Sequence, residues 1–375
     1  MTPLNILHVL RTPVGGLFRH VLDLSRGQIA RGHKVGLVMD ADSGGPRVDT
    51  ALKELAPSLA LGLSRHSMRR TPGVADIAAL MHVMRRIGAT HADVVHGHGA
   101  KGGAYARLAC NAGHAIRAYT PHGGSLHFDR STIAGRVYLG IERLLMSRSD
   151  LIVFESGYSA EVFRRKVGDP SGLSRVVHNG VTAGEFEPVA VTAQATDLLF
   201  IGELRQLKGV DVLIEAVGRL HSRGRPVTAA IVGAGTERAE FERQVHRLGL
   251  DGAIRFPGAM PARQAFALGR VLVVPSRAES LPYVALEAGA AGKPLIATAV
   301  GGIAEILGPD AGRLVPPDDA AALAEAILTT LDRPEQTAAA AAALRGRIAD
   351  GFSVDSMVDG VLAAYAEAMA ARGQR

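Results

Sequence analysis

The sequence predicts an α/β protein made of two doubly wound parallel-sheet, Rossmann-like domains that face a cleft. The first observation behind this prediction is length, because 375 residues are more than one hydrophobic core comfortably supports. The second is that short apolar runs of strand length alternate with helical patterns, and the third is that both halves of the chain show this alternation. Such alternation is typical of βαβ units, in which a parallel sheet carries helices on both faces.

In the first half, several apolar runs have the length and composition of strands. They span residues 5–10, 34–40, 58–63, 92–98, 116–122, 151–155 and 175–178. Helical patterns lie between most of these runs, over residues 17–30, 74–86 and 136–146 among others. We assign residues 1–187 to an N-terminal domain of this kind.

The second half repeats the scheme. Its predicted strands span residues 198–202, 227–232, 254–257, 271–275, 295–299 and 312–315. Between the halves, residues 181–196 lose periodicity and contain Glu185, Glu187 and Pro188, so we place the linker there and assign 188–355 to the C-terminal domain. A final helix, about 356–375, has no obvious strand partner and could pack back on the first domain.

Composition indicates an ordinary globular protein, with 47% hydrophobic and 21% charged residues. Cys110 is the single cysteine, which excludes an intramolecular disulfide framework and fits a reducing compartment. The first ten residues lack the features of a signal peptide, and no apolar run reaches transmembrane length. We therefore expect a cytoplasmic protein.

Positive charge is concentrated in the first half. Residues 1–187 hold 23 Lys and Arg against 15 Asp and Glu, whereas residues 188–375 hold 19 against 21. Such an excess suits an anionic membrane surface or a lipid phosphate, but dispersed arginines are more often a solvated face. Nucleic acid is not expected as a partner, because the chain has no zinc finger, basic-region helix or RNA-binding aromatic signature.

Two carboxylates, Glu279 and Glu287, bracket a turn and the first turns of a predicted helix. Pro282 has a fixed φ and no N–H donor, which suits the first helical position, and residues 284–291 continue as a helix. The apolar run 270–275 precedes them, so both carboxylates follow the C-terminal end of a strand. Open α/β sheets bind ligands at that end, and the pattern indicates a site that holds hydroxyl groups.

Two cations, Arg205 and Lys208, lie on the loop between a predicted strand and the next helix. Arg offers planar bidentate donors and Lys a compact charge, so together they suit a diphosphate as its charge develops. The alternative is a pair of surface cations at a helix start, where positive charge is mildly unfavourable.

Glycines follow two of the predicted strands. Gly15 and Gly16 precede the first long helix, so their backbone N–H groups can approach an anionic or sugar group closely. Gly233 begins a shorter Gly-Ala-Gly element. Neither segment is the G-x-G-x-x-G fingerprint, so a nicotinamide cofactor is not expected. A ribose-binding acid at Asp40 and a metal-binding D-x-D at Asp40 and Asp42 are weak alternatives.

Three histidines, His96, His98 and His122, stand at the ends of two consecutive predicted strands beside glycines. An imidazole there can bond a sugar hydroxyl or a phosphate. The i, i+2 spacing of His96 and His98 also suits a metal, but the usual ligand companions are missing, and structural histidines are a further alternative. No Ser/His/Asp order or nucleophile elbow is present.

Together these motifs resemble those of the family 4 glycosyltransferases, which have the GT-B fold. The matching features run in the expected order along about the whole chain: Gly15-Gly16, His96, Thr120-Pro-His122, Asn179-Gly-Val181, Gly202-Glu-Leu-Arg205 with Lys208-Gly209, Gly233-Ala-Gly235, Phe256-Pro-Gly258 and the Glu279 and Glu287 pair. A Glu-x7-Glu pair alone is weak, but its combination with the Arg/Lys loop is specific.

The resemblance implies a hexosyltransferase of class EC 2.4 that moves a sugar from a nucleotide diphosphate sugar with retention of anomeric configuration. It implies neither a metal nor another cofactor. The acceptor would be a glycan or a lipid-linked molecule of polysaccharide or glycolipid synthesis, reached from the cytoplasm or from the inner membrane face.

The resemblance also assigns roles to single residues. Arg205 and Lys208 would hold the donor diphosphate, Glu287 the ribose and Glu279 the donor sugar. Other donor contacts would come from Gly16, Gly233, Ser280 and Leu281, and His122 would touch the sugar near the reacting centre. The acceptor would dock on the first domain, near Gly15, His96 and His98.

Two other functions remain compatible with these residues. A nucleotide-sugar epimerase or hydrolase of the same fold would turn over the donor without an acceptor. A non-enzymatic nucleotide-sugar binding protein would bind the donor without turnover.

Overall fold

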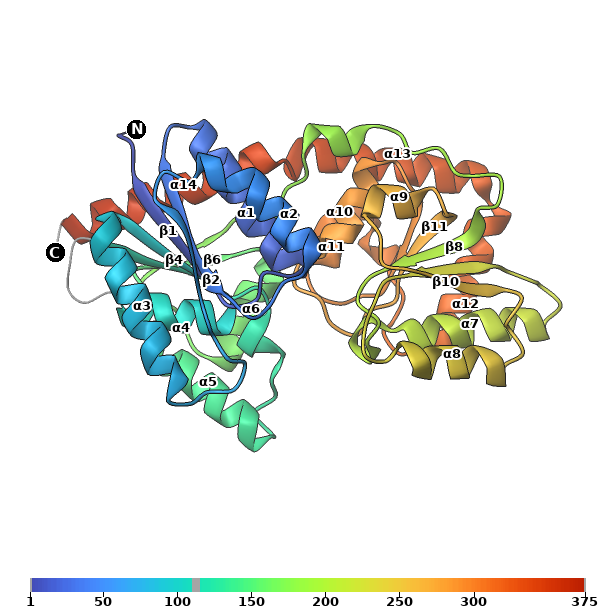
Figure 1. Cartoon of the computed structure of the whole chain (residues 1–375). Coiled ribbons are helices and arrows are strands. Elements are labelled where there is room, and N and C mark those ends of the chain that lie inside the picture. Colours follow the sequence, from blue (N-terminus) through green and yellow to red (C-terminus); the bar gives the residue numbers. More distant parts are fainter. Residues whose placement is uncertain (1, 110–114, 374–375) are drawn as a thin grey trace. The chain divides into compact units, whose positions relative to one another are not determined.

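The computed structural model describes residues 2–109 and 115–373 (Figure 1). Cys110 and the last two residues of the predicted C-terminal helix lie outside the described residues. The chain divides into two compact units, Met1–Asn179 with Val354–Arg375, and Gly180–Ser353. Each unit is described by itself.

The sheet of the first unit is entirely parallel. Its described strands pair in the order β3-β2-β1-β4-β5-β6-β7. The strands are β1 Asn5–Leu10, β2 Lys34–Asp40, β3 Gly62–His66, β4 Val94–His98, β5 Ile116–Thr120, β6 Leu151–Phe154 and β7 Leu173–Val176. Because β1 pairs with both β2 and β4, the strand order reverses between β1 and β4.

Helices cover both faces of this sheet. They are α1 Gly15–Ala30, α2 Pro46–Leu55, α3 Ala75–Thr90, α4 Gly99–Ala109, α5 Ile133–Met146, α6 Gly157–Lys166 and α14 Val354–Gly373. Apolar side chains of β1 alternate between the faces: Ile6 lies in a buried cluster with residues of α1 and α14, whereas Leu7 and Val9 lie in one with α3 and α4. This alternation follows from the two-residue period of a strand.

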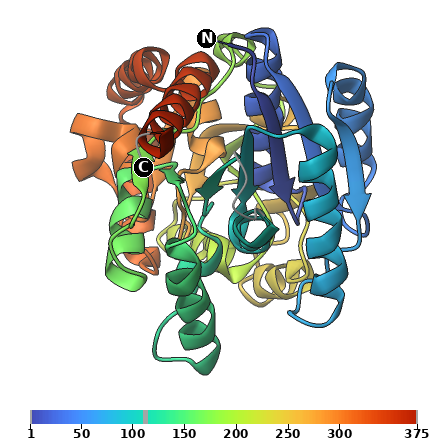
Figure 2. The same cartoon turned by 90° about the vertical axis from the view of Figure 1, so that its left-hand side faces the viewer.

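The last helix, α14, belongs to the first unit although it follows the second in sequence. It packs on α1, β5 and β6, and it lies beside this sheet in the view of Figure 2. Met357, Val358, Val361 and Tyr365 are almost fully buried along one side of it. Gly27 of α1 allows close approach, because a Cβ there would overlap Val358.

The second unit contains a second parallel sheet. Its described strands pair in the order β10-β9-β8-β11-β12, with bounds β8 Thr196–Ile201, β9 Ala229–Val232, β10 Ile254–Gly258, β11 Gly269–Val274 and β12 Leu295–Ala297. The order reverses between β8 and β11. The prediction of two doubly wound parallel sheets is therefore confirmed.

The helices of this unit also lie on both faces of its sheet. They are α7 Val210–Ser222, α8 Arg238–Arg247, α9 Ala262–Phe266, α10 Tyr283–Ala290, α11 Ile303–Leu307, α12 Ala320–Asp332 and α13 Pro334–Gly351. One buried cluster joins the sheet to α7, α8 and α12, and another joins it to α9, α10 and α11.

The unit boundary lies between Asn179 and Gly180, not between 187 and 188 as the loss of periodicity predicted. The reason is that Val181 forms a parallel bridge with Ser353 and is buried in a cluster of the second unit. The segment after it is therefore held by the second unit.

Two predicted strands also differ from the structure. The strand predicted at 58–63 begins at Gly62, because Ala56–Ser58 forms a 3-10 turn after α2. The strand predicted at 312–315 is reduced to one bridge between Thr298 and Val315, because Gly308–Arg313 is a 3-10 helix. Among the described residues, no helix is long and apolar enough to cross a membrane.

Candidate active site

The loops that follow β8 and β11 bring the two central charged residues together. β8 and β11 are paired neighbours, and the strand order reverses between them. Chains that leave such a pair diverge to opposite sides and open a crevice at the carboxyl edge, where ligands of open α/β sheets bind. Lys208 lies on the first of these loops and Glu279 on the second.

Lys208 and Glu279 form an ion pair at this edge of the sheet. The Lys208 Nζ donates to Glu279 Oε1 at 2.6 Å, and Ser276 Oγ donates to the same oxygen at 2.7 Å. The side chains are 27% and 10% exposed, respectively, so both charges are largely shielded from water. A charge pair in that setting has a stronger electrostatic effect than one on an open surface.

Arg277 connects the two loops that carry Lys208 and Glu279. Its guanidinium bonds both carboxylate oxygens of Asp211 at 2.7 and 2.8 Å and contacts Asp318 at 2.5 Å. It also donates to the carbonyl of Gln206, and its backbone N–H donates to Leu207 O at 2.9 Å. These carboxylates raise the pKa of Arg277 above its ordinary value. The loop after β11 is thereby tied to the 3-10 turn after β8.

Glycines let the surrounding backbone segments approach closely. Gly209 has φ +68°, and a Cβ there would overlap the carbonyl of Pro275. Gly301 has φ +60°, and a Cβ there would overlap the carbonyl of Glu279. Gly233 follows β9, and a Cβ there would overlap the carbonyl of Gly202. Glycine is the residue type that adopts such conformations at little cost.

Arg205 lies near Lys208 in sequence but is not bonded to Glu279. Its side chain is exposed, and its Nη1 lies 3.5 Å from Glu203 Oε2. Within the part of the chain that the structure describes, Arg205 forms no hydrogen bond or ion pair with Lys208 or Glu279, and its charge faces solvent.

The segment after Glu279 differs slightly from the prediction. Pro282 is the residue that caps α10 and not its first helical residue, because its ψ of 121° is extended. Glu287 is a half-buried residue within α10. Ser280 O accepts from Gly302 N at 2.6 Å, while the Leu281 side chain is buried in an apolar cluster.

In the first unit, histidines gather where the strand order reverses. His8 of β1 is in register with His96 of β4, and His98 is in register with Thr120 of β5. His122 follows β5 with φ +50°, an uncommon conformation for a residue with a side chain. Gly15, with φ +60°, and Gly16 open α1 and are exposed.

A chain of hydrogen bonds links three of these imidazoles. Gln28 Oε1 lies 2.8 Å from His8 Nε2, His8 Nδ1 lies 2.9 Å from His98 Nε2, and His98 Nδ1 lies 3.1 Å from His122 Nε2. Burial lowers the pKa of His98 and His122 well below the usual range and that of His8 to about 4. The chain is therefore formed by neutral rings.

His96 has a different environment. Its Nδ1 lies 2.7 Å from Tyr365 OH and its Nε2 lies 2.9 Å from Thr120 Oγ1, and the side chain is fully buried. Burial lowers its pKa as well. Both ring nitrogens are used within the unit, which is the environment of a structural histidine.

Asp40, the alternative ribose-binding acid, accepts a hydrogen bond from the backbone N–H of Met68 at 2.7 Å.

Comparison with known families decides which protein class carries these residues. A family model described as Glycosyltransferase Family 4 matches residues 14–184, and one described as Glycosyl transferases group 1 matches residues 195–333. The chain belongs to the family 4 glycosyltransferases.

Curated relatives of this glycosyltransferase align along nearly its whole length. Glycogen synthase of Mycobacterium tuberculosis (strain ATCC 25618 / H37Rv) is 28% identical, covering 96% of this chain and 93% of the relative. D-inositol 3-phosphate glycosyltransferase of Streptomyces scabiei is also 28% identical, covering 95% and 87%.

Solved structures show that the glycosyltransferase has the GT-B fold. Anabaena Alr3699/HepE in complex with UDP and glucose superimposes with a TM-score of 0.81 at 21% identity, covering 97% of this chain and 100% of that one. WaaG, a glycosyltransferase involved in lipopolysaccharide biosynthesis, gives 0.71 at 20% identity, covering 96% and 98%.

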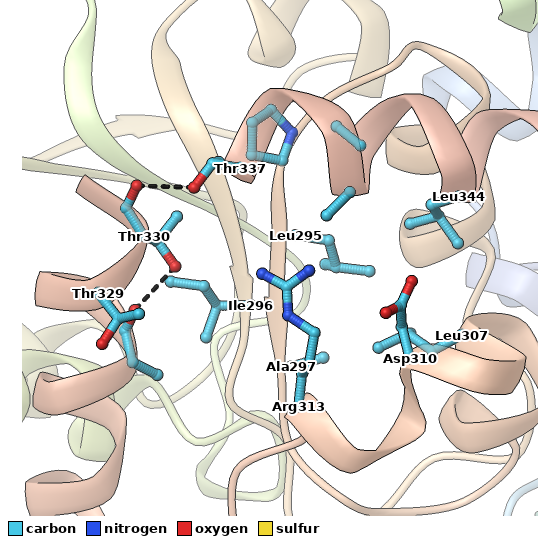
Figure 3. A pocket seen from close by; sticks show the side chains of 14 residues that line it. Leu295, Ile296, Ala297, Leu307, Asp310, Arg313, Thr329, Thr330, Thr337 and Leu344 are labelled. Carbon is cyan, nitrogen blue, oxygen red and sulfur yellow. Dashed lines mark hydrogen bonds between the residues drawn. The ribbon is translucent and has the colours of Figure 1, made fainter. Parts of the chain in front are cut away.

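The glycosyltransferase also has a cavity away from these charged residues. It has a volume of about 270 Å³ and lies in the second unit among β12, α12 and α13 (Figure 3). Arg313 points into it, with Asp310 on one side and Thr329, Thr330 and Thr337 on the other. The threonine hydroxyls already donate to backbone carbonyls, and none of the predicted site residues lines this cavity.

Sequence reasoning missed several residues of these groups. Arg277 and Ser276 support the ion pair, and His8, His20 and Gln28 complete the histidine group. Ser276 and Arg277 directly precede the predicted Glu279 loop, which is a signal that could have directed attention to them. The two-residue period of a strand places the His8 and His96 side chains on the same face of the sheet. Only the pairing of β1 with β4 makes them neighbours.

Proposed function

We propose that this glycosyltransferase moves a hexosyl group from a nucleotide diphosphate sugar to a glycan or lipid-linked acceptor, with retention of anomeric configuration. The observation that carries the proposal is the Lys208–Glu279 pair at the carboxyl edge of the sheet, where the strand order reverses between β8 and β11. A cation suits a diphosphate and a carboxylate suits sugar hydroxyls, so the pair offers both kinds of contact within one donor molecule. The UDP and glucose bound to Alr3699/HepE are a ligand set of this chemistry.

Transfer breaks the bond between the anomeric carbon and the diphosphate oxygen, and the electron pair stays on the diphosphate. A bond to the acceptor oxygen forms on the face that the diphosphate leaves, and the proton of the acceptor hydroxyl passes to the leaving diphosphate. Lys208 and Arg205 stabilise the negative charge that develops on the leaving diphosphate. We propose that these cations make a metal ion or another cofactor unnecessary for the reaction.

Glu279 orients the donor sugar through its hydroxyls, and Glu287 holds the ribose. Backbone groups of Ser280 and Leu281, together with the glycine backbones at Gly16 and Gly233, complete the donor contacts. Arg277 positions Lys208 and Glu279 without touching the donor.

We assign to His122 a contact with the donor sugar near the reacting carbon. Burial lowers its pKa, so its ring is neutral and can donate or accept one hydrogen bond. The acceptor docks on the first unit, near Gly15 and the His96 and His98 strand end.

A donor screen tests this proposal. Uridine, guanosine and adenosine diphosphate sugars should each be added at a series of concentrations while the melting temperature is recorded. A ligand at 100 times its Kd stabilises the folded state by about 2.7 kcal/mol, so we expect one base to raise the melting temperature by several degrees. Donor consumption without any acceptor would favour an epimerase or hydrolase, and binding without turnover would favour a binding protein.

Membrane contact is a second part of the proposal and rests on α5. Ile133, Val137, Ile141 and Leu144 recur at helical spacing on α5 and are exposed, with Ile133 and Leu144 more than 70% exposed. The exposed cations Arg130, Arg136, Arg143 and Arg148 lie on and beside the same helix. An apolar stripe flanked by cations complements the surface of an anionic bilayer. We propose peripheral binding of α5 to anionic lipid at the cytoplasmic face.

Vesicle flotation measures this binding. The protein should float with vesicles that contain anionic lipid at low salt and be released at high salt, because exposed charges are screened. The paired change Ile133→Asp and Leu144→Asp should abolish flotation, whereas Leu248→Asp, at an exposed leucine of the second unit, should not. Absence of flotation at low salt would rule out the membrane contact.

A further inference from the structure

We propose that His20, His98 and His122 form a binding site for one divalent transition metal ion of the kind that imidazole ligates, Zn²⁺ above all. One ring nitrogen from each of the three residues lies within 4.8 Å of the other two. Three imidazoles with room for a further ligand are a common protein set for zinc, and imidazole also binds Cu²⁺, Ni²⁺ and Co²⁺.

His20 supplies the observation that points to a ligand. Its side chain is 2% exposed, and its Nε2 has no hydrogen-bond partner. Its Nδ1 lies 3.0 Å from Asn179 Oδ1, which can only accept. The proton of the neutral ring is therefore on Nδ1, and Nε2 holds a buried lone pair.

The hydrogen-bond chain fixes the tautomer of His98 in a similar way. His8 donates from Nε2 to Gln28 Oε1, so His8 Nδ1 accepts from His98 Nε2. His98 Nδ1 is then an acceptor on its other side. Metal-ligating histidines typically donate their second ring N–H to a carbonyl or similar acceptor, which fixes the tautomer. Asn179 provides that acceptor for His20, and His8 provides it for His98.

His122 completes the set from the loop after β5. Its Nε2 lies 3.1 Å from His98 Nδ1. With metal–nitrogen bonds of about 2.0–2.1 Å, ligand nitrogens of a tetrahedral site are separated by about 3.3 Å. The ion takes the place of the shared proton, which moves to solvent or to His122 Nδ1. His122 is only half-buried, so the ion can reach the site from solvent past this side chain.

The neighbouring group of His8, His96 and His98 is a poorer site, although its ring nitrogens are also within 4.8 Å of one another. His96 bonds Tyr365 and Thr120, and His8 bonds Gln28 and His98. A metal there would have to break these bonds in the core of the unit. The site with His20 loses only the bond between His98 and His122.

A bound ion would occupy His122 Nε2, so this nitrogen could not form a hydrogen bond with another partner. Since the proposed function assigns His122 a contact with the donor sugar, metal binding should inhibit transfer. This consequence rests on the proposed function, whereas binding of the metal does not.

Titration with Co²⁺ tests the site. The untagged full chain, stripped with a chelator, should bind one equivalent of Co²⁺, give the visible absorption of a nitrogen-ligated ion, and lose it when Zn²⁺ is added. His20→Gln and His122→Gln should each weaken binding at least about 100-fold, and Asn179→Ala about 10- to 100-fold. His82→Ala, which removes a ring from the stacked His66–His82 pair of the same unit, should leave binding unchanged.

Thermal unfolding in chelator identifies variants that fold. His122 is half-buried, so His122→Gln keeps the test valid even if His20→Gln fails to fold. Binding of less than one equivalent by the wild-type chain overturns the proposal. So does a folded His122→Gln variant that binds Co²⁺ as tightly as the wild type.

Discussion

Replacement of Lys208 by alanine should lower kcat/KM for sugar transfer by at least about 100-fold. The size follows from the loss of one preorganised charge that faces the leaving diphosphate, a change that typically costs a factor of 10² to 10³. The change also removes the ion-pair partner of Glu279, whose carboxylate would still accept a hydrogen bond from the Ser276 hydroxyl. Initial rates of transfer at varied donor concentration measure this effect.

Two further variants make the Lys208 result specific. Glu279→Gln should lower kcat/KM by a similar factor, and the double variant should lose less than the product of the single losses, because the two side chains share one contact. Arg225→Ala breaks an exposed ion pair of the same unit, with Asp332, and should leave the rate unchanged. A Lys208→Ala enzyme within about threefold of wild type would remove Lys208 from the donor site.

Gly209→Ala is expected to have the second largest effect, although the residue carries no functional group. Its φ of +68° is unfavourable for alanine by about 1–2 kcal/mol, and the new Cβ would overlap the Pro275 carbonyl. The backbone must therefore shift just where it follows Lys208. We expect at least a tenfold loss of kcat/KM together with a lower melting temperature.

Gly224→Ala is the matched control for this change. Gly224 has nearly the same backbone conformation, with φ +72°, but no atom lies within 4 Å of the Cβ position. It should lose about 1 kcal/mol of stability and no activity. If Gly209→Ala and Gly224→Ala had equal transfer rates, the close approach of Gly209 to Pro275 would not matter for catalysis.

Much of the fold followed from periodicity, because buried parallel strands are short apolar runs between helices. Boundaries between the two units and of single elements were predicted less accurately from the sequence where long-range contacts determine them. Val181 looked like the start of a linker, but its bridge to Ser353 attaches it to the second unit, and such a contact has no local signal. The last helix was recognised as unpaired with a strand, and the structure packs it on α1 and the first sheet.

The charged residues of the site were found because two loops at the carboxyl ends of strands carry them. That Lys208 and Glu279 form a pair depends on β8 and β11 being neighbours, which the sequence does not specify. Arg277 was missed for the same reason, since its partners Asp211 and Asp318 lie 66 and 41 residues away. His8 and His20 were missed because they sit inside a strand and a helix, where histidine usually has a structural role.

The most direct test of the account is the nuclear magnetic resonance spectrum of a reaction mixture that contains the donor selected by the screen and a glycan or lipid-linked acceptor. We predict an acceptor-dependent signal of a new glycosidic linkage whose anomeric configuration is that of the donor, and almost none of it with Lys208→Ala. Inversion of the anomeric signal would contradict the proposed stereochemistry. Donor loss at the same rate with and without acceptor would contradict sugar transfer itself.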